Sequence, residues 1–333
     1  MEKERIEWID IAKGIGIGCV VMGHIFSPQM LANKIIFLFH IPLFFYISGF
    51  LYKKASRNGA YTVKKLRNLI VPYFSVFALV YPILFFAYFP EGYTLNQVGN
   101  NILYYVLGGR HLREFANFIF VAMWFISCLF LVQVIYNYIQ TTFKQRTVHI
   151  IVGGMLMASY INSIYFPDFW LYWCANVTLA AIPIYHIGHL SRQIGLDKCL
   201  YKYSLWLIPA GCISALSLVF FPLNRYDMML NYYGIPLITL ICSILCILMI
   251  RSISVYITRS NILTRIFSEF GKASLVIMAF HLPVYQLLWK YFEISSIPAI
   301  VVITILPYFI YHIFNKFKIT QVLFLGKYSK EEK

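Results

Sequence analysis

The fold is decided by stretches such as residues 33–52, which read NKIIFLFHIPLFFYISGFLY. This stretch is almost entirely apolar, and about 20 such residues are what an α-helix needs to cross a lipid bilayer. Comparable stretches recur along the whole chain of 333 residues. The sequence therefore predicts an all-α polytopic membrane protein with about ten transmembrane helices. The predicted spans are 9–29, 33–52, 68–89, 118–140, 147–166, 169–190, 203–221, 230–250, 270–290 and 297–315.

The amino-acid composition excludes the two other broad classes of protein. Hydrophobic residues make up 60% of the chain and charged residues 12%, whereas a soluble domain carries about 25% charged residues. The aromatic content of 18% brings more apolar surface than a disordered chain tolerates. Neither a soluble globular protein nor a disordered one fits these values.

The formal net charge of +15 has two interpretations. In a soluble protein it would suggest a nucleic-acid partner, but in a membrane protein such an excess marks cytoplasmic loops. With ten spans, 21 of the 28 Lys and Arg fall on the side that holds both termini. We therefore predict that both termini are cytoplasmic and that no nucleic acid binds. The basic residues assigned to the outer side are Lys34, Arg110, Arg113, Arg225 and Lys290.

No linker or soluble domain interrupts the apolar stretches. Residues 1–333 are therefore predicted to form a single membrane domain, in which 317–333 is a short basic cytoplasmic tail. The first apolar stretch lacks a small-residue cleavage site, which predicts a retained helix and not a signal peptide. The longest loop, about 90–117, is assigned to the outer side. We predict a multi-pass protein of the cell (cytoplasmic) membrane that contacts the lipid bilayer, while no feature fixes an oligomeric state.

Three ionisable residues lie in the first predicted span, where such residues are costly and commonly functional. Lys13 and His24 are separated along the helix axis by about 16 Å but differ in direction by only about 20°. Asp10 falls on the same stripe of the helix. In an alternative interpretation, Asp10 and Lys13 form an interfacial ion pair that anchors the helix end, which leaves His24 unexplained.

A second histidine, His40, lies on the next predicted span. The turn between these two spans is short, around residues 28–33, and residue 32, the midpoint between His24 and His40, falls inside it. The two histidines are therefore expected at similar depth on antiparallel neighbouring helices. Pro42 follows and is predicted to free a backbone carbonyl and to bend or break the second helix at this point. A histidine pair beside a broken helix indicates a site, although each histidine alone could be a hydrogen-bonded core residue.

Further polar groups come from later in the chain. Ser274 and His281 are seven residues apart, which places them on one face of a helix. Trp124 fits either an interfacial anchor or the wall of a cavity. His186 and His189, near the end of a span, are expected to face solvent or lipid headgroups.

Neither the cysteines nor the histidines predict a metal site. None of the seven cysteines stands in a CxxC spacing, so neither a disulfide framework nor a zinc site is implied. His24, His40 and His281 lack the spacing and the nearby carboxylate of a zinc-binding set. We predict no bound metal.

The segment 53–67 carries six basic residues and no acidic one. Attraction to anionic lipid headgroups explains such a segment, and a phosphate-bearing cytosolic ligand would use the same charges. Arg67, which lies close to Pro72 at the start of the third predicted span, is the best placed of these residues for such a ligand.

Three stretches of the chain resemble the integral-membrane acyltransferase family 3, and within it the fucose 4-O-acetylase-like branch. They are residues 9–15 with the following Gly23-His24, residues 40–50, and residues 271–275 with the following His281. The family's arginine, ten intervening residues and histidine correspond to Lys13 and His24 here. Lysine keeps the positive charge but not the bidentate contacts of a guanidinium.

The resemblance implies a membrane-bound O-acyltransferase, chiefly an O-acetyltransferase. The donor would be a cytosolic acyl-CoA, most often acetyl-CoA, acting as co-substrate with no tightly bound cofactor. The acceptor would be a hydroxyl of a cell-surface glycan or of its lipid-linked precursor. By the same resemblance His24 is catalytic, and Lys13 and Asp10 are assigned with it. Substrate is expected at His40, Ser48, Trp124, Ser274 and His281, and the donor's phosphates at Arg67 and Lys64.

Two other functions use the same features. Intramembrane polar groups also line the path of a transporter or flippase, here for a lipid-linked glycan. A succinyl or longer-chain acyltransferase of the same fold would share every motif. Release of free CoA in the presence of acceptor separates the enzymes from the transporter.

Overall fold

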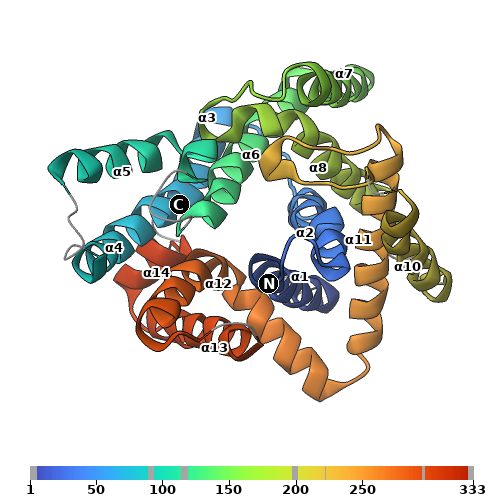
Figure 1. Cartoon of the computed structure of the whole chain (residues 1–333). Helices are drawn as coiled ribbons and strands as arrows, with labels where there is room; N and C mark the ends of the chain where they lie inside the picture. The colour runs from blue at the N-terminus through green and yellow to red at the C-terminus, as the bar shows by residue number, and fades with distance from the viewer. Residues whose placement is uncertain are drawn as a thin grey trace. The chain divides into compact units, whose positions relative to one another are not determined.

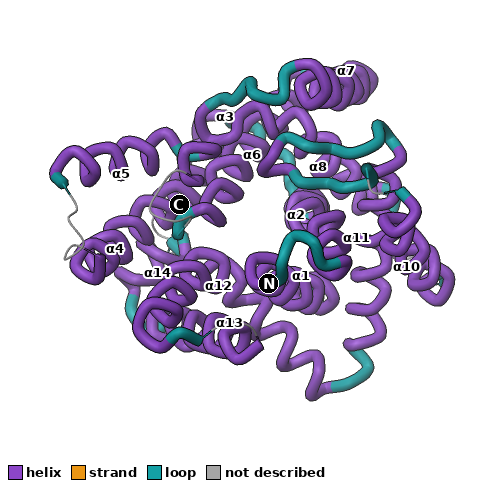
Figure 2. Tube along the Cα trace, in the orientation of Figure 1, coloured by secondary structure: helices purple, strands orange, loops and turns teal. Residues whose placement is uncertain are grey.

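The computed structural model describes residues 6–88, 94–113, 119–196, 202–221, 223–294 and 297–328. These residues form helices and loops without a β-strand, apart from one isolated bridge between Asp227 and Tyr232 (Figure 2). The helices are α1 (Glu7–Ile25), α2 (Leu31–Phe50), α3 (Asn58–Lys65), η1 (Leu66–Ile70), α4 (Val71–Tyr88), α5 (Leu95–Leu107), η3 (Gly109–Arg113), η5 (Val121–Met123), α6 (Trp124–Thr142), α7 (Gln145–Tyr165), η6 (Tyr172–Val177), α8 (Thr178–Gln193), α10 (Ser204–Phe220), η7 (Met228–Leu230), α11 (Ile238–Ile257), α12 (Asn261–Phe292), α13 (Ile297–Phe314) and α14 (Lys318–Leu325).

The all-helical class is confirmed, and each of the ten predicted spans overlaps a helix. Within the described residues, six helical segments are long and apolar enough to cross a membrane. Ser204–Phe220 and Pro298–Phe314 are apolar but shorter. The number of ten crossings and the side of the termini stay predictions. The six long segments are Glu7–Ile25, Leu31–Phe50, Asn58–Ala87, Val121–Thr142, Gln145–Tyr165 and Ile238–Ile257.

The expectation of a broken helix at Pro42 is wrong, because α2 continues through it to Phe50, while a bend at this point stays a prediction. Proline removes one backbone N–H, but a membrane helix tolerates this where neighbouring groups satisfy the freed carbonyl. Five further helices of this chain also hold an interior proline: α4, α8, α10, α12 and α13.

The chain divides into two compact units. Unit 1 comprises Met1–Lys53, Val152–Pro167 and Leu179–Ser274, and unit 2 comprises Lys54–Ile151, Asp168–Thr178 and Leu275–Lys333. The division falls within α7 and α12. In unit 1, α1 and α2 pack on each other and on α11, while α10 packs on α11 and α2 (Figure 1).

Unit 2 is built on α4. Tyr73 of α4 and Tyr105 of α5 each donate a hydrogen bond to the other's carbonyl, at 2.7 and 2.6 Å. Helix α14 also packs on α4. Because α14 spans Lys318–Leu325, the first part of the predicted tail 317–333 is helical. Gly326, with φ +60°, ends α14 where a Cβ would lie 2.3 Å from the Asn68 carbonyl oxygen.

Candidate active site

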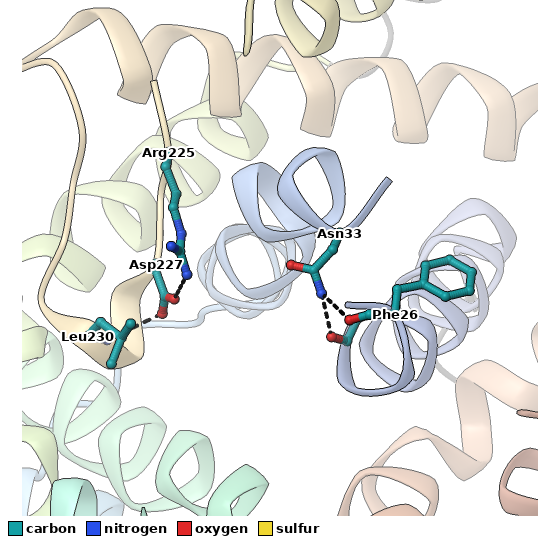
Figure 3. A network of polar contacts seen from close by, with 6 residues as sticks. Phe26, Asn33, Arg225, Asp227 and Leu230 are labelled. Carbon is teal, nitrogen blue, oxygen red and sulfur yellow. Dashed lines mark hydrogen bonds and ion pairs between the residues drawn. The ribbon is translucent and has the colours of Figure 1, made fainter. Parts of the chain in front are cut away.

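The α1–α2 hairpin is held at its turn by one buried side chain. The Asn33 Nδ2 donates to the Gly23 and Phe26 carbonyl oxygens at 2.8 and 2.9 Å (Figure 3). Carbonyls at the end of a helix have no partner within the helix, and Asn33 supplies one for two of them. The amide thereby ties the last turn of α1, which carries His24, to the start of α2.

His24 and His40 lie on the two arms of this hairpin, on helices α1 and α2 that pack on each other. His24 is half-buried, and His40 is 4% exposed. The His40 Nδ1 lies 2.7 Å from the Ile36 carbonyl oxygen. Because a carbonyl only accepts, Nδ1 carries the proton, and the lone pair of the neutral ring is on Nε2. The Phe37 ring packs edge-on against His40, with the ring centroids 4.8 Å apart.

Asp10 and Lys13 form the ion pair of the alternative interpretation. The Lys13 Nζ lies 3.7 Å from the Asp10 Oδ1, one turn earlier on α1, and the two side chains are 27% and 11% exposed. Side chains three residues apart lie on the same face of a helix and can pair in this way. The ion pair and a functional role of Lys13 are compatible, because the Lys13 side chain stays partly exposed.

Glycines bring α1 directly onto the first half of α12. A Cβ at Gly14 would lie 2.1 Å from the Phe267 carbonyl oxygen, and one at Gly271 would lie 1.9 Å from the Asp10 carbonyl oxygen. The contacts are reciprocal, and they place the first and third resembling stretches side by side within unit 1. Ser274 is half-buried one turn beyond Gly271.

The second resembling stretch makes the same kind of contact with α8. A Cβ at Gly49 would lie 1.9 Å from the Tyr185 carbonyl oxygen, and one at Gly188 would lie 2.1 Å from the Tyr46 carbonyl oxygen. Ser48, next to this crossing, is half-buried. Each of the three resembling stretches thus contributes a glycine to a helix crossing of unit 1.

Unit 2 holds two of the predicted substrate residues. Trp124 is 5% exposed at the start of α6, and its ring packs edge-on against Phe125. His281 is fully buried on α12, and its Nδ1 lies 3.0 and 2.9 Å from the Ile277 and Met278 carbonyl oxygens. His281 is therefore the same tautomer as His40.

The predicted donor-binding residues, Lys64 and Arg67, also belong to unit 2 and are exposed. Lys64 lies in the last turn of α3, and Arg67 lies in the single π-helical turn η1 that joins α3 to α4. The Arg67 guanidinium lies 5.7 Å from the centre of the Tyr328 ring. The Tyr328 hydroxyl donates to the Arg67 carbonyl oxygen at 3.3 Å.

The expectation that His186 and His189 face solvent or headgroups is wrong. They are 4% and 6% exposed, because the Gly49–Gly188 crossing lays α2 over this face of α8. The His189 ring packs edge-on against Tyr52, with centroids 4.9 Å apart. The three-residue spacing of His186, His189 and Arg192 marks one face of a helix, but it does not show whether that face is buried.

Arg192 begins a chain of contacts at this end of unit 1. Its Nη1 donates to the Phe50 carbonyl oxygen at 3.1 Å, and its guanidinium lies 5.7 Å from the centre of the Phe50 ring. The Phe50 ring packs edge-on against Trp8, and the Arg251 guanidinium lies 5.9 Å from the centre of the Trp8 ring. Arg251 is 4% exposed. Sequence analysis assigned none of these four residues to a site.

The described residues contain no group of three or more His, Cys, Asp and Glu side chains arranged to hold a metal ion. The described cysteines are free thiols, and Cys199 lies outside the described residues.

These helices and the polar groups between them define a multi-pass membrane protein with a histidine pair on its first helical hairpin. The chain belongs to acyltransferase family 3: the family's model, described as an acyltransferase domain, matches residues 6–319. The match covers nearly the whole chain and makes the protein an acyltransferase. No curated protein and no solved structure matches the chain.

Proposed function

We propose that the protein is an O-acyltransferase of the cell membrane that moves an acyl group, chiefly acetyl, from cytosolic acyl-CoA to a hydroxyl of a glycan. The acceptor is a cell-surface glycan or its lipid-linked precursor, and the nearest branch of the family is the fucose 4-O-acetylase-like one. The observation that carries the proposal is the family match over residues 6–319, which includes His24 and His40 on the packed α1–α2 hairpin.

The chemistry requires a base that works near neutral pH, and histidine has an ordinary pKa near 6.5. In one route His24 takes the proton of the acceptor hydroxyl while that oxygen attacks the thioester carbonyl carbon. The C–S bond breaks, and the CoA thiolate receives the proton. In the other route a His24 ring nitrogen attacks the thioester carbonyl carbon, the C–S bond breaks and CoA leaves as the thiolate. The acceptor hydroxyl then attacks the acyl-imidazole, the C–N bond breaks, and the proton of the hydroxyl passes through the imidazole to the CoA thiolate. Both routes need His24.

Lys13 and His24 cannot serve the same reacting atoms, because about 16 Å of helix separates them. We therefore assign Lys13 to the charged part of the donor and His24 to the acyl group. The long pantetheine arm of CoA, which joins its phosphates to its thioester, suits this separation. The exposed cations Lys64 and Arg67 of unit 2 also have the chemistry to bind phosphate.

The direct test uses the full chain in lipid vesicles with acetyl-CoA labelled in the acetyl group. Surface polysaccharide from a strain lacking the gene serves as acceptor. We expect label in the polysaccharide and an equal amount of free CoA. His24→Gln should reduce transfer by at least about 100-fold, since it removes the base. The exposed His149 of α7 provides the control, and His149→Gln should keep full activity.

Two results would contradict the proposal. Full transfer by the His24→Gln variant would remove His24 from the mechanism. Movement of a lipid-linked glycan across the vesicle membrane without CoA release would favour the flippase. In cells, deletion of the gene should remove O-acetyl signals from the proton NMR spectrum of the surface polysaccharide.

A further inference from the structure

Residues 223–237, which we call the outer strap, join α10 to α11 in unit 1. The strap reaches the histidine hairpin through Arg225, whose guanidinium lies 6.0 Å from the centre of the Phe37 ring. Phe37 is the ring that packs against His40. One aromatic side chain therefore stands between Arg225 and the histidine pair.

Arg225 is fixed on the strap by a buried carboxylate. Its Nη2 donates to the Asp227 Oδ2 at 2.7 Å, and the Asp227 Oδ1 accepts the Leu230 N–H at 3.2 Å (Figure 3). The Asp227 side chain is 5% exposed, whereas that of Arg225 is 38% exposed. A guanidinium has five N–H donors, and the Asp227 contact uses one of them. Asp227 thus holds the Arg225 guanidinium in place, and N–H groups that do not contact Asp227 can donate to a ligand.

The backbone of the strap is tightly constrained. Asn231, Gly234 and Leu237 all have φ in the left-handed region, at +56°, +63° and +63°. For a residue as bulky as leucine this conformation is strained, and such strain is concentrated at functional sites. Two bonds to α7 hold the strap: Leu237 N–H donates to the Tyr160 hydroxyl at 2.9 Å, and Asn231 Nδ2 donates to the Asn162 Oδ1 at 3.0 Å.

The strap also has buried polar atoms that the described residues leave without a hydrogen-bond partner. They are the Asn224 Oδ1, the Tyr226 hydroxyl and the Asn231 Oδ1, on side chains that are 1% to 2% exposed. Burial raises the pKa of Tyr226, so its hydroxyl stays a neutral donor. Unpartnered polar atoms are costly and call for an explanation. A strap with this many polar groups suits a hydroxyl-bearing ligand better than it suits an acyl chain.

We propose that the outer strap binds the acceptor, with Arg225 donating hydrogen bonds to hydroxyl oxygens of a carbohydrate beside Phe37 and His40. Asp227 is a positioning residue, because it acts by holding Arg225. The inference rests on the proposed function and adds the acceptor site to it. Exposed donors on Arg225 and an adjoining aromatic ring together match the hydroxyl groups and the apolar C–H face of a sugar.

The test uses the full chain in lipid vesicles, labelled acetyl-CoA and the polysaccharide from the deletion strain. Arg225→Ala should raise the KM for polysaccharide by about 10- to 100-fold, the effect of losing charge-assisted hydrogen bonds. The kcat should stay within about twofold, and the KM for acetyl-CoA should not change. Asp227→Asn should raise the same KM by a smaller factor, since it loosens Arg225 without removing it.

Arg110 provides a matched control. It is also an arginine assigned to the outer side, it pairs with Asp168 at 3.6 Å, and it lies 5.4 Å from the centre of the Trp170 ring. Arg110→Ala should leave the KM for polysaccharide unchanged. If Arg225→Ala does not fold, as judged by gel filtration, Arg225→Lys takes its place. Lysine keeps the charge but has fewer donors, so its KM should still rise.

Binding of the same polysaccharide to the purified chain separates the two proposals. If the parent chain binds the polysaccharide and Arg225→Ala does not, the strap proposal is supported even when no acetyl transfer occurs. In that case only the proposed function is contradicted. A folded Arg225→Ala variant with unchanged polysaccharide binding and KM would overturn the strap proposal. A raised KM for acetyl-CoA would overturn it too, since Arg225 would then act on the donor.

Discussion

Lys13 shows how one residue can fit a structural and a functional interpretation. Its distance of 3.7 Å to the Asp10 carboxylate is the ion pair that an anchored helix end would have. The family's pattern has arginine at this position, and arginine would hold a carboxylate with two parallel hydrogen bonds. Lysine binds Asp10 as a point charge, which makes the partner easier to exchange for a phosphate of the donor.

Asn33 is the residue whose loss should most directly disturb the hairpin turn. Asn33→Ala removes the donor to the Gly23 and Phe26 carbonyl oxygens. We expect a loss of about 1–3 kcal/mol in unfolding free energy, because these carbonyls then lose a buried partner. Thermal unfolding of the purified chain measures the loss.

Acyl transfer by Asn33→Ala should fall by more than the loss of folded protein, since Asn33 also positions His24. The control is Asn315→Ala, whose exposed side chain accepts from Lys327 at 2.7 Å. It should change stability by no more than about 0.5 kcal/mol. Equal effects of the two substitutions would show that the hydrogen bonds of Asn33 neither stabilise the turn nor position His24.

At the level of elements, the two glycine crossings decide which helices meet. Gly271→Ala adds a single Cβ, which would meet the Asp10 carbonyl oxygen at 1.9 Å. The backbones of α1 and α12 must then separate, at a cost of about 1–3 kcal/mol. We expect a lower thermal midpoint and lower activity.

Gly153 of α7 is the matched control, since a Cβ there meets no atom within 4 Å. Gly153→Ala should be neutral or slightly stabilising, because alanine favours a helix by about 1 kcal/mol over glycine. A midpoint for Gly271→Ala equal to that of Gly153→Ala would mean that α1 and α12 do not touch.

The elements also show what the sequence could predict. Apolar stretches of about 20 residues located a helix in each of the ten ranges, because the length of such a stretch is itself the signal. The predicted span 230–250 begins too early, since α11 starts at Ile238. Residues 230–237 are largely apolar yet belong to the strap, and the left-handed conformations of Asn231 and Leu237 leave no mark in hydropathy.

The sequence interpretation missed helix α5 within the outer loop 90–117, although a motif in the sequence marks where the helix starts. Thr94 and Gln97 form a capping box, in which the Gln97 side chain accepts from the Thr94 N–H at 2.7 Å. That motif is readable. The buried state of His186 and His189 was not, because it depends on contact with another helix through Gly49 and Gly188.

At the scale of the whole molecule, sidedness is open to a labelling experiment. Within unit 1, Arg225, which the charge count assigns to the outer side, lies near Phe37 in the first half of α2. Arg192 and Arg251, which it assigns to the cytoplasm, contact Phe50 at the end of α2 and Trp8 at the start of α1. Asp168, 93% exposed, is assigned to the outer side, and the exposed Arg57 is assigned to the cytoplasm.

A membrane-impermeant maleimide applied to intact cells should therefore label Asp168→Cys and not Arg57→Cys. Both variants should react after the cells are opened, and the parent chain gives the background of its own cysteines. Labelling of Arg57→Cys in sealed cells would invert the predicted topology.

The contact between Asp10 and Gly271 has one more consequence. The charged residues Arg265, Glu269 and Lys272 lie near it on α12, and the turns that follow are mainly apolar. In the predicted topology the contact therefore lies at the cytoplasmic edge of the hydrocarbon layer. His24 lies 14 residues beyond Asp10, or about 21 Å along α1, and the hydrocarbon layer is about 30 Å thick. In the proposed reaction the acetyl group would then cross most of the membrane while CoA stays on the cytoplasmic side, so that no activated metabolite would have to be exported.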